Sequence, residues 1–304
     1  MQQINNTLSI AIPVYNFADM IPATLESLIP QAKIYNIEIM IFDGCSTDNT
    51  QLIIQSYQKK YPLIRYIKAL NKGGIDVDMA KTVDLARGKY CWLFSGDDIC
   101  VDGSISFILS IIEKHEPDLI LGRHNECNKN MEVQSQWPIL DIKKDRIFNL
   151  NKKEDRSLYL EKALTSEAFF SFMTGLIINR QTWLQGILHD NLKKSNWAHV
   201  ARLWALIDSP FILYYSDRII VNRRGENDSF SNNGMLERLK IQIIDLQKAV
   251  KTVSSNNEII KTLKRVIKNE VYPNWSEAVR NDLKALNANE SKFKELDNML
   301  KEIN

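Results

Sequence analysis

Short apolar runs alternate with segments of helical periodicity through the first half of the chain. Residues 8–14 form an apolar run typical of a buried strand. The next segment repeats apolar side chains at helical spacing, at Ile21, Leu25, Leu28 and Ile29. This alternation continues with short connections, which predicts a parallel sheet built from βαβ units. Further strands are expected at residues 37–42, 63–67, 90–94 and 118–121, and further helices before residue 60 and at residues 76–86 and 103–114.

The second half has a less regular pattern. From residue 122 to about residue 151, scattered charges and short apolar pieces predict a small β excursion or a substrate-specific insertion. Periodicity then returns, with a helix at residues 156–164, a buried segment at 169–178, a helix at 196–207 and a strand at 211–221. After Gly234 the composition becomes helical and rich in Lys. We therefore expect an α/β domain over residues 1–232, with a mostly parallel sheet flanked by helices, and a helical C-terminal extension over residues 233–304.

Composition and charge narrow the class of protein. With 304 residues, 44% hydrophobic and 25% charged, the chain is typical of a soluble globular protein with a large core. A net charge of +2, and aromatic residues without a base-stacking pattern, argue against a nucleic-acid partner. No signal-peptide pattern occurs, and no stretch approaches the ~20 apolar residues that span a bilayer. Four cysteines without metal-site spacing indicate free thiols and a cytoplasmic protein; they are Cys45, Cys91, Cys100 and Cys127.

Polar residues follow each of the first four predicted strands. In a parallel sheet the carboxyl ends of such strands lie on one edge, where open α/β sheets bind ligands. We therefore expect the four segments to converge and to hold a pyrophosphate between them. They are Tyr15-Asn16, Asp43-Gly44, the turn at residues 71–74, and Asp97-Asp98.

The pair Asp97-Asp98 and the step Asp43-Gly44 suit a nucleoside diphosphate. Paired carboxylates bind a hard divalent cation, which shares its oxygen ligands with a substrate phosphate. Asp43 is expected to accept a hydrogen bond from a pyrimidine N–H or a ribose hydroxyl, and Gly44 to let the backbone approach closely. The alternative is that these residues only cap helices and shape turns.

Three of these signatures together resemble those of family 2 GT-A glycosyltransferases. They are residues 12–16 (IPVYN), residues 43–50 (DGCSTDNT) and the pair Asp97-Asp98, and the resemblance covers about residues 8–125. A narrower likeness to the abequosyltransferases of O-antigen synthesis reaches about residue 232. It is carried by residues 73–78 (GGIDVD), 81–83 (KTV), 90–94 (YCWLF), 198–200 (AHV) and 224–230 (RGENDSF).

The resemblance implies a Rossmann-like GT-A fold with a nucleotide-sugar half at residues 1–125 and an acceptor half at residues 126–232. It implies transfer of a sugar, such as the 3,6-dideoxyhexose abequose, from a CDP or UDP donor. The acceptor would be an oligosaccharide linked to undecaprenyl diphosphate, or another glycan, in bacterial surface polysaccharide or O-antigen synthesis. The alternative is a nucleotide-sugar-binding module without turnover. A Rossmann dehydrogenase is disfavoured because no G-x-G-x-x-G follows the first strand.

The resemblance also implies roles at the nucleoside end of the donor. Pro13, Tyr15 and Asn16 would line the base and ribose pocket. Asp43 would recognise the base, and Ser46 would shape the loop that holds Asp43.

At the other end of the donor, Asp76 and Lys81 match positions near the diphosphate or the sugar. Asp97 matches the acid that binds Mn²⁺ or Mg²⁺, with Asp98 beside it as a second metal residue. Many relatives have an acid where this chain has Ser95. One carboxylate with two phosphate oxygens and waters is still enough to hold such a cation.

Inverting relatives carry a carboxylate base late in the domain, often in an acidic pair. The matching stretch, residues 190–199, has no such pair. His199 is the nearest candidate base, because an imidazole titrates near neutrality, and Asp190 is the runner-up; a structural histidine is the alternative. Arg223 and Arg224 suit a mobile loop that clamps phosphate, with a solvated surface turn as the alternative.

Basic residues outnumber acidic ones between residues 248 and 284, and apolar side chains at residues 259–267 interleave with them. A basic amphipathic helix of this kind can lie on an anionic membrane surface. A lipid-linked acceptor would favour such peripheral contact with the cytoplasmic face of the inner membrane. The alternatives are helices that pack on the catalytic domain or form a dimer contact.

Overall fold

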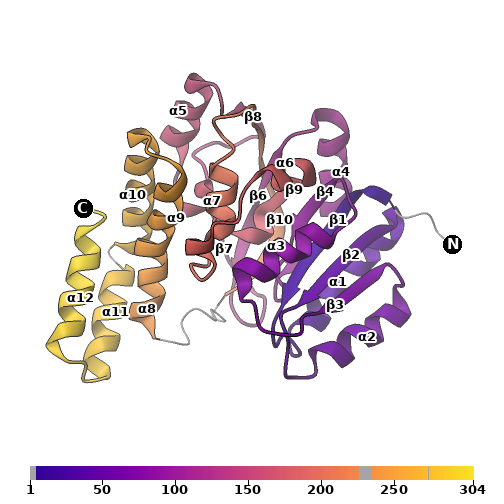
Figure 1. Cartoon of the computed structure of the whole chain (residues 1–304), viewed down its shortest axis with the longest axis horizontal. Helices are drawn as coiled ribbons and strands as arrows, with labels where there is room; N and C mark the ends of the chain where they lie inside the picture. The colour runs from indigo at the N-terminus through magenta and orange to yellow at the C-terminus, as the bar shows by residue number, and fades with distance from the viewer. Residues whose placement is uncertain (1–4, 226–233, 273) are drawn as a thin grey trace.

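The computed structural model describes residues 5–225, 234–272 and 274–304. Within these ranges ten strands form one sheet in the order β3-β2-β1-β4-β9-β6-β10-β5, with β7 beside β6 and β8 beside β10 (Figure 1). The strands are β1 (Asn5–Val14), β2 (Ile37–Asp43), β3 (Ile64–Lys68), β4 (Tyr90–Leu93), β5 (Ile99–Cys100), β6 (Leu119–Cys127), β7 (Val133–Gln136), β8 (Arg146–Asn149), β9 (Leu176–Asn179) and β10 (Ile212–Arg224).

The sheet is mostly parallel, as predicted. β1 pairs in parallel with both β2 and β4, and β2 pairs in parallel with β3. β9 runs antiparallel between β4 and β6, whereas β6 and β10 are parallel to each other. Every residue of β2 is buried, as expected of an inner strand that is covered on both faces. The carboxyl ends of β1, β2, β3 and β4 therefore lie on one edge of the sheet.

Helices cover both faces of this sheet (Figure 1). On one face α1, α2 and α4 pack through side chains such as Leu25, Ile54 and Ile108. On the other face α3 and α7 join the C-terminal helices through side chains such as Val83 and Leu263. The helices up to β10 are α1 (Ile21–Tyr35), α2 (Thr50–Lys60), α3 (Ile75–Leu85), α4 (Ser104–His115), α5 (Lys153–Lys162), α6 (Arg180–Gln185) and α7 (Ala198–Trp204), with the 3-10 turns η1 (Ser166–Phe169), η2 (Met173–Gly175) and η3 (Asp190–Leu192).

Several of the predicted elements begin or end at other residues in the structure. The region at residues 122–151 contains the short strands β7 and β8, which confirms the β excursion. The strand predicted at residues 211–221 continues to Arg224, because β10 keeps pairing with β6 as far as Cys127. This extension places two arginines in the sheet.

The C-terminal extension is helical, as predicted, and lies along one side of the molecule (Figure 1). Its elements are α8 (Met235–Lys240), the π-helical turn η5 (Ile241–Asp245), α9 (Leu246–Val253), α10 (Asn257–Val271), α11 (Asn274–Ala285) and α12 (Glu290–Lys301). α9 contacts α7, and α10 contacts α5 and η1. The predicted boundary at residue 232 lies outside the described residues.

The apolar side of α10 faces the protein interior. Ile259, Leu263 and Val266 are at most 1% exposed. An apolar stripe that is already buried in protein is not available to a membrane surface, so the amphipathic-helix interpretation is wrong for α10. Packing on the catalytic domain, the predicted alternative, is confirmed. Within the parts of the chain that the structure describes, we find no helix with the length and hydrophobicity to cross a bilayer.

Candidate functional site

The loops that follow β1 and β2 are joined by hydrogen bonds. The backbone N–H of Asn16 donates to the Ser46 hydroxyl (2.9 Å), and the backbone N–H of Thr47 donates to the Asn16 side-chain oxygen (2.8 Å). Asn16 has φ +59°, in the left-handed region that Asn tolerates better than most residues. Tyr15 is half-buried beside it, and Pro13 is buried at the end of β1. The structure therefore brings the residues predicted for the base and ribose pocket together.

The loop after β4 packs against the same place. The Thr24 hydroxyl lies 2.9 Å from the Gly96 carbonyl oxygen and 2.8 Å from the Asp98 carbonyl oxygen. Gly96 is so close to the β1 loop that a Cβ atom there would lie 2.9 Å from the Phe17 ring. Asp97 lies between these two anchored residues. The predicted convergence of strand ends is thus confirmed for β1, β2 and β4.

Asp43 ends β2 and is completely buried. Its Oδ1 accepts the backbone N–H of Ser46 (2.6 Å), and its Oδ2 accepts the Tyr66 hydroxyl (2.5 Å). Burial, reinforced by the hydrogen bond to Asp43, raises the pKa of Tyr66, so the phenol remains a donor. In this arrangement Asp43 fixes the β2 loop, and its contact with a nucleobase stays a prediction.

A second acid, Asp78 in the first turn of α3, lies beside Asp43 and was not predicted. A Cβ atom on Gly44 would lie 2.2 Å from the Asp78 Oδ2, so this glycine makes room for a carboxylate. Burial, followed by the charge of Asp43, raises the pKa of Asp78 to about 6, and Lys72 opposes the shift. The Lys72 ammonium itself lies 3.9 Å from the centre of the Tyr15 ring. Asp is common in the first turn of helices, because its negative charge interacts favourably with the helix dipole. Its presence at residue 78 therefore did not by itself indicate a binding site.

Asp76 and Lys81, both on α3, have different surroundings. Asp76 is buried, and its two oxygens accept the backbone N–H groups of Asn196 and Ala198, each at 3.0 Å. These bonds satisfy donors at the start of α7, as a capping side chain does. Lys81 is exposed on the outer side of α3. Their predicted roles near the diphosphate or the sugar stay predictions, and the geometry gives Asp76 a positioning role.

The two acids after β4 have different surroundings. Asp98 is 2% exposed; its Oδ2 accepts the Thr174 hydroxyl (2.6 Å), and its Oδ1 accepts the backbone N–H of Arg224 (3.1 Å). Burial, followed by the charge of Asp97, raises the pKa of Asp98 to about 8. Asp97 is only half-buried, and the Ser95 hydroxyl donates to its Oδ1. Burial raises the pKa of Asp97, and the hydrogen bond from Ser95 works against that rise.

Asp97 fits the predicted cation site better than Asp98. Its Oδ2 has no hydrogen-bond partner among the described residues, so it is free to bind a ligand. A cation held through one carboxylate takes its other ligands from phosphate and water. Both oxygens of Asp98 are already engaged inside the protein. Outside the three gaps in the description, no group of three or more His, Cys, Asp or Glu side chains forms a metal site by itself.

Arg223 and Arg224 lie in β10 and not in a mobile loop, which corrects the prediction. Arg224 donates from Nε to the Asp97 carbonyl oxygen (3.0 Å), and Arg223 pairs with Glu126 (2.9 Å between Nη1 and Oε2). Burial alone would lower the pKa of Arg223, but the nearby acids outweigh it and raise the pKa. The rest of the predicted loop, residues 226–229, lies outside the described residues. The two arginines therefore stand on the sheet next to the acid pair.

A buried cluster next to Arg223 was also not predicted. His124 on β6 is 0% exposed; its Nε2 lies 3.6 Å from the Glu126 Oε2, and its Nδ1 lies 3.4 Å from the Glu167 Oε2. Both ring nitrogens of His124 and the Glu167 Oε2 lack a hydrogen-bond partner within the described chain. Burial lowers the pKa of His124 to about 4 and raises the pKa of Glu167 well above its usual value. His124 and Glu126 lie on β6, whereas Glu167 comes from η1 and Arg223 from β10, so no single sequence motif contains the whole cluster.

Neither candidate base joins this network. His199 is 4% exposed, and its Nε2 donates to the Phe170 carbonyl oxygen (3.1 Å). Burial lowers the pKa of His199 to about 4, which keeps the ring neutral at pH 7. Asp190 is exposed on η3 and pairs with Lys193 (2.5 Å). The geometry favours a structural role for His199, which the sequence left open as the alternative.

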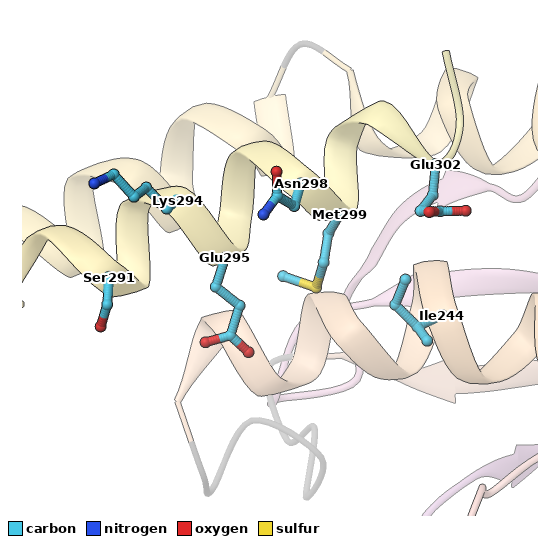
Figure 2. Close-up of a pocket in the computed structure, with 7 residues that line it drawn as sticks. All are labelled: Ile244, Ser291, Lys294, Glu295, Asn298, Met299 and Glu302. Carbon is cyan, nitrogen blue, oxygen red and sulfur yellow. The ribbon is translucent and has the colours of Figure 1, made fainter.

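A separate hollow lies between α12 and η5, within the C-terminal helices (Figure 2). In Figure 1, α12 lies on the opposite side of the molecule from β1 and β2. The hollow has no strand-end loop and no buried acid pair, so the sheet edge is the stronger candidate site. Its walls carry Ile244, Ser291, Lys294, Glu295, Asn298, Met299 and Glu302.

Solved structures with the same fold contain nucleotides. TarS of S. aureus (residues 1–349) in complex with UDP matches with a TM-score of 0.64 at 14% identity, over 98% of this chain and 80% of that chain. The mannosyltransferase PcManGT of Pyrobaculum calidifontis, in complex with GDP-Man and Mn²⁺, matches with a TM-score of 0.57 at 12% identity, over 94% of this chain and 75% of that chain. At these identities the likeness shows the GT-A fold alone.

Sequence comparison adds the family. Abequosyltransferase RfbV of Salmonella typhimurium is 28% identical over 261 residues, which are 84% of this chain and 77% of that protein. Glycosyltransferase GlyG of Streptococcus pneumoniae is 25% identical over 121 residues, 40% of each chain. The family model described as glycosyl transferase family 2 matches residues 9–177, from β1 into β9. Since this match spans more than half of the 304 residues, the chain belongs to glycosyl transferase family 2.

Proposed function

We propose that this glycosyltransferase moves a 3,6-dideoxyhexose such as abequose from a CDP or UDP donor to a glycan acceptor. The likeness to an abequosyltransferase over 84% of the chain supports the sugar. UDP and UDP-GlcNAc in the TarS structures support a pyrimidine nucleotide. An oligosaccharide linked to undecaprenyl diphosphate, in bacterial surface polysaccharide or O-antigen synthesis, is the acceptor that fits the same likeness.

The observation that carries the proposal is that the β1 loop contacts both the β2 loop and the β4 loop, which carries Asp97. In our proposal the nucleoside lies against Pro13, Tyr15, Asn16 and the Asp43–Ser46 loop. The half-buried ring of Tyr15 offers a face for stacking, which at present carries the Lys72 ammonium. Lys72 would leave that face when a base stacks there and would stay close to the donor as a cation.

The diphosphate would lie between Asp97 and the arginines of β10. A divalent cation such as Mn²⁺ or Mg²⁺, when bound at Asp97, offsets the negative charge that grows on the departing nucleoside diphosphate. Arg223 supplies a permanent positive charge next to it, held in place by Glu126. Asp98 is assigned to holding the backbone of β10 through Arg224 and not to the cation.

We do not assign proton transfer to His199 or Asp190. A base must come within hydrogen-bond reach of the acceptor hydroxyl. His199 uses its Nε2 on a backbone carbonyl inside the core, and Asp190 is paired with Lys193 at the surface. Both therefore serve as structural residues in this proposal.

Thermal-shift measurements on the purified chain with CDP, UDP, GDP and dTDP, each with and without Mn²⁺, test the donor class. We expect CDP or UDP with Mn²⁺ to give the largest shift, because bound ligand stabilises the folded state by mass action. Release of the nucleoside diphosphate from the matching nucleotide sugars then tests turnover. Tight nucleotide binding without turnover of any donor would favour the non-catalytic binding module instead.

A further inference from the structure

Glu270 on α10 joins the C-terminal helices to the catalytic domain through a compact polar cluster. Its Oε1 accepts the backbone N–H of Ser166 (2.7 Å) and the Ser166 hydroxyl (3.0 Å). Its Oε2 accepts the side-chain amide of Gln242 (2.8 Å). The same amide donates to the Ser166 hydroxyl (3.0 Å), which closes a ring of hydrogen bonds. Three elements, η1, η5 and α10, therefore meet at one carboxylate.

Both carboxylate oxygens of Glu270 accept hydrogen bonds within this cluster. Burial raises the pKa of Glu270 to about 7, and the hydrogen bonds from Ser166 and Gln242 offset part of that rise. A carboxylate taken out of water is tolerated only where such bonds satisfy it. Gln242 lies in the π-helical turn η5, and π-helical turns are rare and often occur at functional positions.

The turn that Glu270 holds carries a residue of the buried cluster beside the donor site. Glu167 follows Ser166 directly, and its carboxylate lies 3.4 Å from the His124 Nδ1. Arg223 and Asp98 both act on Glu167 electrostatically. A displacement of η1 would therefore change the charges that surround Arg223.

We infer that Glu270 is a positioning residue of the transferase: through Ser166 it fixes Glu167 beside His124 and so holds Arg223 in the orientation that the donor diphosphate requires. The inference rests on the proposed function, because it needs Arg223 at the diphosphate. It gives the C-terminal helices a part in the active site. They pack on the catalytic domain, where α9 contacts α7 and α10 contacts α5 and η1.

A matched pair of variants tests this role. Glu258 lies on the same helix and also accepts a hydrogen bond from a serine of the catalytic part, the Ser157 hydroxyl (3.0 Å), but it is exposed and far along α10 from Glu270. We expect Glu270→Ala to speed hydrogen exchange in peptides that cover residues 163–171. We also expect it to lower kcat about tenfold with less than about a threefold change in the donor KM, because a misplaced charge slows the reaction more than it weakens binding. Glu258→Ala should change neither.

A swap of the two side chains keeps the test valid if Glu270→Ala does not fold. Glu270→Gln places two amides against each other, and Gln242→Glu places two acids together, so each single variant should lose activity. In the double variant the carboxylate moves to η5 and the amide to α10, and every donor again has an acceptor. We expect the double variant to recover most of the wild-type kcat and the slow exchange of residues 163–171.

The outcomes separate this inference from the proposed function. Faster exchange in residues 163–171 with an unchanged kcat would overturn the positioning role and leave the glycosyltransfer intact. Unchanged exchange in Glu270→Ala would also overturn it, because the cluster would then not hold the turn. A wild-type protein that turns over no nucleotide sugar would overturn the proposed function, and the positioning role with it.

Discussion

Two neighbouring parts of the sheet edge carry the polar residues of this enzyme, and they are built in different ways. Around β1 to β4 the contacts join loops that directly follow strands, as in the bond from Asn16 to Ser46. Around β6 and β10 the polar residues come from separate elements. The pairing of β10 with β6 brings Arg223 opposite Glu126, and the 3-10 turn η1 brings Glu167 to His124. Short sequence motifs therefore identify most of the first part, whereas the second part can be recognised only in the folded protein.

The two parts also differ in their access to a ligand. Asp97, at the β4 end, is half-buried and keeps one carboxylate oxygen without a partner in the described chain. His124 and Glu167 are buried, and burial drives both toward their neutral forms by lowering one pKa and raising the other. In our proposal the first part therefore contacts the donor, and the second part supports it.

Substitutions of Asp97 and Asp98 give the strongest test of this difference in access to a ligand. Asp97→Asn should reduce turnover by about two to three orders of magnitude, because it removes the charge that we place on the cation at the diphosphate. Asp98→Asn should instead lower the free energy of unfolding by about 1–3 kcal/mol, since its oxygens hold Thr174 and the Arg224 backbone. Nucleoside diphosphate release and chemical denaturation measure the two effects. A larger loss of turnover in Asp98→Asn than in Asp97→Asn would reverse our assignment.

Arg223 lies between the two parts, and a conservative substitution tests whether the shape of its guanidinium group matters. Arg223→Lys keeps the charge but loses the planar fork that pairs with Glu126, so we expect about a tenfold loss in kcat/KM for the donor. Arg218→Lys is the matched control, because Arg218 lies exposed on the same strand with its guanidinium over the Phe107 ring. Steady-state kinetics with the preferred donor distinguish them. Equal effects at the two positions would remove Arg223 from the diphosphate.

A substitution of Asp78 tests whether this acid contributes to binding the nucleoside end of the donor. Its pKa of about 6 reflects burial beside Asp43, so its ionised form at pH 7 costs stability. Asp78→Asn should therefore leave the thermal midpoint unchanged or raise it, yet weaken nucleoside diphosphate binding about threefold to tenfold. Asp84→Asn, an exposed position on α3, should change neither quantity. Calorimetric titration provides the affinities, and unchanged affinity in Asp78→Asn would make this acid a packing residue only.

The sequence was sufficient for the mostly parallel sheet and, apart from Asp78, for the loops of the first part of the edge, and the reason is physical. Alternating apolar runs determine βαβ units, and a polar residue directly after a parallel strand can lie only on one edge. The sequence could not identify His124 or Glu167, because a lone polar residue in an apolar region acquires neighbours only through tertiary pairing. It placed Arg223 in a loop because a basic pair ahead of a glycine follows the predicted strand, whereas β10 gains its last pairs from β6.

Among these substitutions, His199→Gln should change turnover least, and it should clearly change how the free energy of unfolding depends on pH. Its pKa falls from 6.5 in the unfolded chain to about 4 in the fold, because burial disfavours the charged ring. The unfolded state therefore binds the proton first, and stability is lost as the pH falls from 6.5 toward 4, by about 3 kcal/mol in total.

His199→Gln keeps a donor for the Phe170 carbonyl oxygen and cannot titrate, so its unfolding free energy should fall less steeply over this range. Urea denaturation between pH 4.5 and 7 measures the slopes, and turnover at pH 7 should stay within about twofold of the wild type, provided that the fold is intact. A large loss of turnover in a stable His199→Gln protein would restore this histidine as the base.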